Sequence, residues 1–478
     1  MNIILTETNK PKYRQIAEQL EQLIMNGTIL PGSFLPTNRE LATQLNVDRS
    51  TIISAYNHLT SIGLIESIPR KGTIVKETMW GLSLKDLFTW SKIKSRNFTP
   101  SDPLLLRYKE NLSNPHVLNL SDGIVTPEDL MPEGVYKEIL QSITNTFRYD
   151  KEYGEEFKDV LLEHLDKHCG IRVRKNQVIP SAGIHKSINL VVSSLLNEGD
   201  TVAIECPSWL YSTNIFSSKG IRTVKLDIEE EGIDPEQIYQ LYKRHRIKMI
   251  FVNPTFQSPS TSVLSVQKKK RILEICKELE IGIVEYEAFR NLSFSSRKKL
   301  SPTLFSLDEE NQSVIHIADH GDLSFYTLCE IGWILAPQMI IDIINDSTFQ
   351  QRLQPQNINL AMATEYLGTG LWKARNQDLK IKLHARSKIV LNTLKKYNQN
   401  STFSYAIPQG GHELWCKINK PINDKQLFEK CLQHGVLISP SGIYGKPNEG
   451  YVKLSFALCP ADILEEGIRR FCETVIEA

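Results

Sequence analysis

The sequence predicts a chain of two structural parts, a short N-terminal α+β unit and a much larger α/β unit. The chain has 478 residues, which is too many for a single hydrophobic core, since such cores stop growing at about 250 to 300 residues. Three helical patterns and two short β-rich runs occupy residues 1–78, whereas β-rich runs alternate with amphipathic helices through residues 118–478. Residues 79–117 keep neither period throughout and are expected to be a linker with one helical piece.

The composition is that of an ordinary globular protein. Hydrophobic residues make up 41% and charged residues 23% of the chain, so neither disorder nor a fibrous class is indicated. Lysine and arginine total 56 against 55 for aspartate and glutamate, so any nucleic-acid contact must come from local placement of charge. The eight cysteines form no Cys-x-x-Cys pair, and neither an apolar leader nor a membrane-length apolar run is visible. We therefore expect a cytoplasmic protein with reduced thiols.

The N-terminal unit begins with a predicted amphipathic helix over residues 13–25. Its apolar residues recur at helical spacing, and Asn26-Gly27 supplies a stop. Two further helices are expected over residues 38–45 and 49–62. A helix, a short turn and a second helix form the motif that lays a recognition helix in the major groove of DNA.

Capping signals mark the starts of the second and third helices. Thr37-Asn-Arg-Glu40 is a capping box, in which the Thr37 hydroxyl accepts from the Glu40 amide while the Glu40 side chain reaches back. Asp48 is placed to cap the third helix. Arg49, Ser50 and Thr51 begin that helix and would meet the base edges.

A basic turn between two short strands follows the third helix. Residues 64–68 and 73–75 are β-rich, and Pro69-Arg-Lys-Gly72 joins them. This pattern predicts a wing, with Arg70 and Lys71 placed to reach phosphate or the minor groove. The unit is therefore predicted to be a winged helix-turn-helix.

The sequence of this unit resembles the GntR family of bacterial repressors. The resemblance rests on Pro11-Lys-Tyr-Arg-Gln-Ile-Ala, Leu35-Pro-Thr-Asn-Arg39-Glu-Leu-Ala42, Val47-Asp-Arg-Ser-Thr51 and Lys71-Gly-Thr73. It implies that Arg39 and Arg49 contact double-stranded DNA, assisted by Thr51 and the Lys71-Gly72 wing tip. The family usually has a small polar residue where Asp48 stands, so Asp48 is not counted among the predicted DNA contacts. The predicted DNA-binding residues are Arg39, Arg49, Ser50, Thr51, Arg70, Lys71 and Gly72.

The large unit alternates strands and helices, which predicts an α/β sheet covered on both faces with ligands at the carboxyl ends of the strands. The expected strands cover residues 178–180, 201–204, 223–226, 248–252, 281–284 and 314–317.

The order of strands and loops in the large unit resembles the fold-type I aminotransferases. The landmarks include Ser181-Ala-Gly183-Ile-His185, Glu205-Cys-Pro-Ser-Trp209, Asn253-Pro-Thr-Phe-Gln257-Ser-Pro259, Glu285-Tyr-Glu-Ala-Phe289 and Gly410-Gly-His-Glu-Leu-Trp415. The join to a GntR-like head resembles the MocR-like subfamily of regulators. This resemblance implies a homodimer, a dual-domain regulator and pyridoxal phosphate as the family cofactor.

The residues that pyridoxal phosphate chemistry requires are missing at the expected positions. That chemistry needs a lysine for the Schiff base, a carboxylate on the pyridinium nitrogen and an aromatic side chain on the ring, for which Trp209 is available. Counting forward from the strand places Asp322 at the lysine position, and counting back from Gly332 places Leu323 there; the chain has no lysine between Lys299 and Lys373. Tyr286 stands where the pyridine-binding aspartate would be, and Glu287 could substitute only with a local shift of the chain.

Three further positions depart from the same pattern. Phe289 replaces a tyrosine, Ser258 replaces an asparagine, and Lys453 stands where an arginine would clamp the substrate carboxylate. We therefore expect no catalytic residues, no covalent cofactor and a non-covalent effector pocket for a small cationic or zwitterionic ligand. The predicted pocket residues are Gly183, His185, Trp209, Gln257, Ser258, Tyr286, Glu287, Phe289, Asp322 and Lys453.

Three other functions compete with this interpretation. A working aminotransferase with an accessory DNA-binding head would need an unrecognised lysine such as Lys299. The large unit can also be a dimerisation scaffold that binds no effector. A metal hydrolase would use His316-Ile-Ala-Asp-His320, but this run spans a strand end, where alternate residues face opposite sides, so no metal site is expected.

Overall fold

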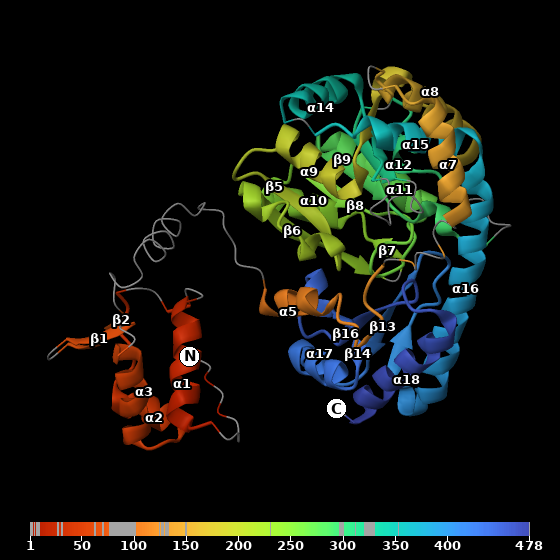
Figure 1. Cartoon of the computed structure of the whole chain (residues 1–478). Helices are drawn as coiled ribbons and strands as arrows, with labels where there is room; N and C mark the ends of the chain where they lie inside the picture. Colours follow the sequence, from red (N-terminus) through yellow and green to blue (C-terminus); the bar gives the residue numbers. More distant parts are fainter. Residues whose placement is uncertain are drawn as a thin grey trace. The chain divides into compact units, whose positions relative to one another are not determined.

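The computed structural model describes residues 3, 5, 10–25, 28–29, 32–61, 64–68, 71–75, 102–123, 125, 129, 133–148, 151–229, 231–295, 301–310, 312–319, 330–351 and 353–477. The chain divides into two compact units, Met1–Phe98 and Thr99–Ala478, and each is described by itself (Figure 1). Within the described residues, no helix has the length and apolar character needed to cross a bilayer.

The small unit consists of three helices and an antiparallel hairpin, as the sequence predicts. Its elements are α1 (Lys12–Met25), α2 (Asn38–Leu45), α3 (Arg49–Ser61), β1 (Ile65–Ile68) and β2 (Gly72–Val75). The apolar faces of the three helices share one core, whose fully buried members include Ile16, Leu20, Leu41, Ile52 and Leu59. The two strands pair from Ile65 opposite Val75 to Ile68 opposite Gly72.

One feature of the hairpin is not evident from the sequence. The segment before α2 adds a short third strand to it, because Phe34 bridges Ile74 and the Leu35 amide donates to the Thr73 carbonyl at 2.9 Å. The chain that leads into α2 is thereby tied to the hairpin. The hairpin projects from the three helices (Figure 1).

The large unit is built on one eight-stranded sheet. In spatial order the strands are β4 (Val178–Ser181), β11 (Gly332–Leu335), β10 (Val314–Asp319), β9 (Gly282–Glu287), β8 (Met249–Val252), β5 (Thr201–Cys206), β6 (Arg222–Glu229) and β7 (Gly232–Ile233). Neighbouring strands from β10 to β6 are parallel. β11 runs antiparallel to both of its neighbours, and β7 runs antiparallel to β6. Each of the six predicted strands lies in this sheet.

Helices cover both faces of the sheet, as the alternation predicts. α9 (Gly183–Leu195) and α14 (Gln338–Gln351) cover one face, where Ile188, Ile317 and Val284 are buried. A second core on the opposite face contains Ile283, Val314 and residues of the remaining helices. Those helices are α7 (Glu133–Thr146), α8 (Gly154–His164), α10 (Gln237–His245), α11 (Val266–Glu278), α12 (Leu304–Leu307) and α15 (Asn357–Gly368).

The C-terminal part forms a separate antiparallel sheet. Its strands, in order, are β12 (Phe403–Tyr405), β13 (Glu413–Ile418), β16 (Tyr451–Ser455) and β15 (Ser439–Pro440). A parallel pair, β3 (Leu118–Asn119) with β14 (Val436–Leu437), joins the start of the large unit to this region. α16 (Leu371–Tyr397), α17 (Asp424–Gln433) and α18 (Ala461–Glu477) pack with these strands. The long α16 runs along one side of the large unit (Figure 1).

A helix lies inside the stretch expected to be a linker. α5 (Pro103–Asn111) begins at an Asp102 cap, whose carboxylate accepts from the Leu104 amide at 2.7 Å, with Pro103 at the first helical position. Leu104 packs into the core beside the small sheet, and the Arg107 Nε lies 3.2 Å from a carboxylate oxygen of Glu429. α5 therefore belongs structurally to the large unit.

Candidate functional site

The starts of α2 and α3 carry four of the residues predicted to contact DNA. The capping box is present, since the Glu40 amide donates to the Thr37 hydroxyl at 3.3 Å and the Thr37 amide donates to the Glu40 carboxylate at 2.8 Å. Arg39 on α2 and Arg49 and Ser50 on α3 are exposed, whereas Thr51 is half-buried.

The wing tip also exposes predicted contact residues. Lys71 and Gly72 are exposed, and the Lys71 amide donates to the Ile68 carbonyl at 3.0 Å to close the turn. Gly72 has a φ of +120°, which other residues rarely adopt, so the turn needs glycine. Arg70 lies outside the described residues. The exposed cations thus lie on the two helices and the turn that a winged helix-turn-helix presents to DNA.

The large unit contains a cavity of about 610 Å³ at the carboxyl ends of the central strands. This volume is in the usual range for small-molecule sites, about 300 to 1,000 Å³. Seven of the predicted pocket residues line it: Gly183, His185, Trp209, Ser258, Tyr286, Phe289 and Lys453. Asp322 lies outside the described residues.

Aromatic side chains form one wall of the cavity. The Trp209 ring centroid lies 4.2 Å from that of His185 and 5.8 Å from that of Tyr286. Tyr286 is fully buried, and its hydroxyl lies 3.2 Å from the Ser208 hydroxyl. Burial and the charge of Glu205 raise the pKa of Tyr286 well above its ordinary value. This wall therefore presents a neutral phenol.

Lys453 is paired with a carboxylate of the same cavity. Its Nζ lies 3.4 Å from a carboxylate oxygen of Glu413 and 5.5 Å from the ring centroid of Tyr444. Burial alone would lower the pKa of Lys453, but Tyr444 and Glu413 raise it above its ordinary value. The lysine is thus a protonated, buried cation that already has a counter-charge. Lys186 also lines the cavity; it is exposed and forms an ion pair with Glu330.

Two predicted pocket residues do not reach the cavity, which corrects the expectation from the sequence. Gln257 is buried beside it, where its side chain donates to the Pro207 carbonyl at 2.7 Å and accepts from the Ser260 amide at 2.9 Å. Glu287 lies between Tyr286 and Ala288, which both line the cavity. Because alternate residues of a strand face opposite sides, Glu287 points to the other face of the sheet. There it accepts from Thr255 and Arg290.

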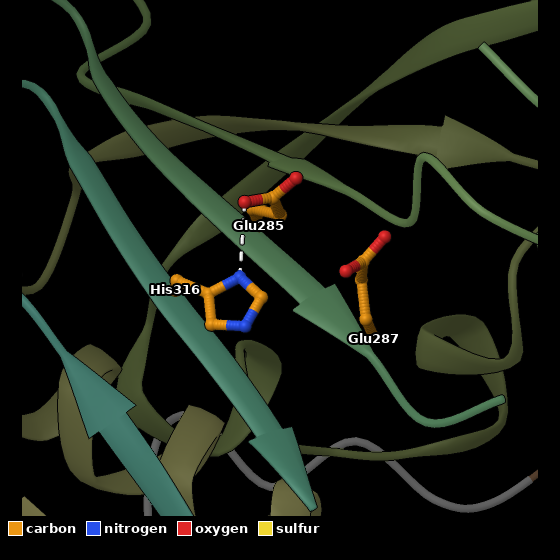
Figure 2. A group of neighbouring side chains, drawn as sticks. All are labelled: Glu285, Glu287 and His316. Atoms are coloured by element: carbon orange, nitrogen blue, oxygen red, sulfur yellow. Dashed lines mark hydrogen bonds and ion pairs between the residues drawn. The ribbon is translucent and has the colours of Figure 1, made fainter. Parts of the chain in front are cut away.

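Glu287 belongs to a buried polar cluster with Glu285 and His316 (Figure 2). The His316 Nδ1 lies 3.0 Å from a Glu285 carboxylate oxygen. Glutamate and histidine are both metal ligands, and the cluster differs from the run of residues 316–320 considered from the sequence, of which His320 lies outside the described residues.

Protein groups already satisfy both carboxylates of this cluster. Glu285 accepts from the amides of Leu304 and Phe305 at 2.7 and 3.1 Å, and Glu287 accepts from Arg290 at 3.1 Å. Burial acts to raise the pKa of Glu285, but the hydrogen bond and charge of His316 and the charge of Lys269 lower it. We therefore interpret the cluster as a structural charge network that ties β9 to α12 and β10.

Several cavity residues were not anticipated. Asn253, His412, Glu413 and Tyr444 line the cavity, and so do Leu105, Tyr108 and Lys109 of α5 and Leu112, which follows that helix. Glu413 stands in a landmark of the sequence, Gly410-Gly-His-Glu-Leu-Trp415, but nothing in that run indicates which side chain points inward.

Comparison with known proteins gives two family matches. Residues 12–75 match the family described as bacterial regulatory proteins, gntR family, and residues 115–471 match aminotransferase class I and II. A Bacillus subtilis (strain 168) protein, the uncharacterized HTH-type transcriptional regulator YdfD, is 29% identical over 96% of this chain and 95% of its own. The HTH-type transcriptional regulator NorG of Staphylococcus aureus is 25% identical over 88% of this chain and 95% of its own.

Solved structures match the large part of the chain. Pyrococcus horikoshii kynurenine aminotransferase has a TM-score of 0.74 at 20% identity, covering 82% of this chain and 99% of that one. LysN, the α-aminoadipate aminotransferase of Thermus thermophilus, has a TM-score of 0.71 at 22% identity, covering 81% of this chain and 98% of that one. At these identities the likeness establishes the fold alone.

The fold and the matches define a class of protein, a transcriptional regulator with a GntR-type winged helix-turn-helix and an aminotransferase-like domain. The chain belongs to the aminotransferase class I and II family through residues 115–471. The join of this domain to a GntR-type head agrees with the MocR-like subfamily suggested by the sequence.

Proposed function

We propose that the large unit of this regulator is an effector-sensing and dimerisation module that has no transaminase activity and holds no covalent cofactor. The small unit binds operator DNA through Arg39, Arg49 and the wing. A ligand in the large unit then changes DNA binding by favouring one arrangement of the chain over another.

Tyr286 stands where the aminotransferase pattern has its pyridine-binding aspartate, and this position carries the proposal. A pyridinium nitrogen needs a carboxylate to keep its proton, so that the ring can act as an electron sink. Tyr286 points into the cavity as a buried, neutral phenol, whereas the nearest carboxylates along β9, Glu285 and Glu287, face the opposite side of the sheet. The described residues therefore do not fit a bound pyridoxal ring.

The lysines of the cavity also argue against a Schiff base, which requires a neutral amine. Lys453 is held protonated by Glu413 and Tyr444. Lys186 is exposed at the mouth and paired with Glu330. Lys109 is exposed on α5. The cavity thus lacks a suitable nucleophile among its described residues.

The charge around the cavity is equally unsuited to a phosphate. Within the described lining there is no arginine, and its three lysines face four carboxylates, Asp122, Asp319, Glu330 and Glu413. The first residues of α9, Gly183 and Ile184, offer backbone amides but neither a hydroxyl nor a charged side chain. A dianionic phosphate would therefore meet net repulsion.

The test is whether the pure protein forms an imine. We expect no visible aldimine absorbance after incubation with pyridoxal phosphate, and only scattered substoichiometric labelling after borohydride reduction and peptide mapping. A stoichiometric adduct on one lysine of the cavity would overturn the proposal and favour a working aminotransferase. A matched aminotransferase treated identically serves as the positive control.

A further inference from the structure

We infer that the cavity binds a small organic cation, a protonated amine on an apolar or aromatic body, and that Glu413 is its counter-charge. This inference rests on the proposed function, because it assumes that the cavity is not filled by a covalent cofactor. It names the chemical class of the effector, which the fold alone leaves open.

Glu413 is the feature that points to a ligand. It begins β13, it is 2% exposed and it lines the cavity. Among the described residues, neither of its carboxylate oxygens accepts a hydrogen bond. Its pairing with Lys453, at 3.4 Å, is longer than a charge-assisted hydrogen bond, which measures about 2.7 to 2.9 Å. A carboxylate can accept at about four sites, so Glu413 keeps capacity for a donor from a ligand.

The arrangement of Lys453 decides the sign of that ligand's charge. Lys453 is held between Glu413 and the face of Tyr444, so a ligand carboxylate that approached it would also meet the negative charge of Glu413. A ligand ammonium, by contrast, would donate to the oxygens of Glu413 that lack a hydrogen bond. The pair is neutral overall, so the preference for a cation comes from the Glu413 oxygens that lack a hydrogen bond and from the excess of carboxylates in the described lining.

The walls of the cavity fit the rest of such a ligand. Trp209, Tyr286, Phe289 and Tyr444 supply aromatic surface, against which both an apolar body and an ammonium group are stabilised. Asn253 adds a second acceptor, because its side-chain oxygen is buried without a described partner while its side-chain nitrogen donates to the Tyr286 carbonyl at 2.9 Å. The described lining contains one more carboxylate than it contains lysines, and this excess of negative charge also favours a cationic ligand.

The experiment compares matched probes on the full-length protein by titration calorimetry. The probes are 2-phenylethylamine, 3-phenylpropionate and 2-phenylethanol, together with hexylamine, hexanoate and hexanol. We expect at least one amine to bind about tenfold or more tightly than its acid and its alcohol, which is the effect of one hydrogen bond to a charged group.

Variants then assign the preference to Glu413. Glu413→Gln keeps the shape and removes the charge, and should weaken amine binding by about tenfold to a hundredfold. Since this change leaves Lys453 buried without its partner, the double variant Glu413→Gln with Lys453→Met tests the same loss in a cavity without an unpaired charge. Glu465→Gln is the control, because Glu465 pairs with Lys396 on the exposed surface at 2.7 Å.

The inference is overturned if an acid binds as tightly as its amine, if no probe amine binds, or if the folded Glu413 variants bind amines as the wild type does. These outcomes differ from a failure of the proposed function, which would appear as an imine with pyridoxal phosphate. A protein that forms no imine and still binds operator DNA, but ignores amines, contradicts only the ligand class.

Discussion

Neighbouring side chains of β9 serve opposite sides of the molecule because a strand sends alternate residues to opposite faces. Tyr286 points into the cavity, whereas Glu285 and Glu287 enter the charge network on the other face. The network includes Arg290, which donates to Glu287 and is 8% exposed, and Lys269, which is fully buried. One residue of register therefore separates a wall of the cavity from a structural ion pair.

Glu205 lies near the cavity and gives a prediction about stability and pH. It is 1% exposed, and its carboxylate accepts from the Asn253 amide at 2.8 Å. Burial raises its pKa to about 8, from an ordinary value of 4.5. Between these two pH values, Glu205 has lost its proton in the unfolded chain but keeps it in the native chain. The free energy of unfolding therefore falls as pH rises, by up to about 1.4 kcal/mol per pH unit, and levels off above pH 8.

Glu205→Gln should remove this contribution, because the amide is neutral at every pH and still accepts from Asn253. Thermal unfolding midpoints between about pH 5 and pH 8.5 should therefore fall more steeply for the wild type than for the variant. Glu198→Gln changes an exposed residue on the loop before β5, and its unfolding midpoint should depend on pH as that of the wild type does. Parallel curves for the wild type and Glu205→Gln would show that Glu205 is ionised in the native state.

At the scale of the element, α3 combines a buried face with an exposed start. Ile52, Ala55 and Leu59 are fully buried against α1 and α2, and the Tyr56 hydroxyl donates to the Pro36 carbonyl at 2.7 Å. These contacts fix the position of the helix within the small unit. Its first residues remain exposed, which is what a recognition helix requires.

Arg49→Ala should therefore weaken operator binding without unfolding the small unit. One bidentate contact from an arginine to a guanine contributes about 1 to 3 kcal/mol, so the loss should be roughly one to two decades in affinity. A gel-shift titration on an operator found by genome-wide mapping measures it. Arg14→Ala on α1 is the matched control, since Arg14 is also exposed but lies outside the helix-turn-helix. Equal affinity of the wild type and Arg49→Ala would remove Arg49 from the interface.

At the scale of the whole molecule, we predict a homodimer formed mainly by the large unit. α14 exposes Met339 and Ile343, and α16 exposes Ile381, whose exposed fractions are 73%, 37% and 60%. Apolar side chains of this size on two helices are candidates for burial against a second copy. Sedimentation at micromolar concentration should give twice the chain mass of 54.5 kDa, with and without DNA. A monomeric mass in both conditions would contradict the prediction.

Local sequence patterns predicted the elements of the small unit, the six central strands and the two-part organisation, because these depend on hydrophobic period, caps and turn residues that are close together in the chain. The resemblance to the aminotransferase pattern also placed seven residues at the cavity. The sequence did not indicate β11 or the C-terminal sheet, whose short strands pair across long intervals of sequence.

Which side chains meet depends on strand pairing and on packing between elements that are distant in the sequence. Glu413 and Lys453 are 40 residues apart and become partners because β13 pairs with β16, and α5 reaches the cavity although it lies in a stretch without a clear pattern. Whether Glu287 enters the cavity depends on strand alternation at a single residue, which a motif alone does not define. Local patterns specify elements, but the pairing of distant charges depends on strand register and packing between elements.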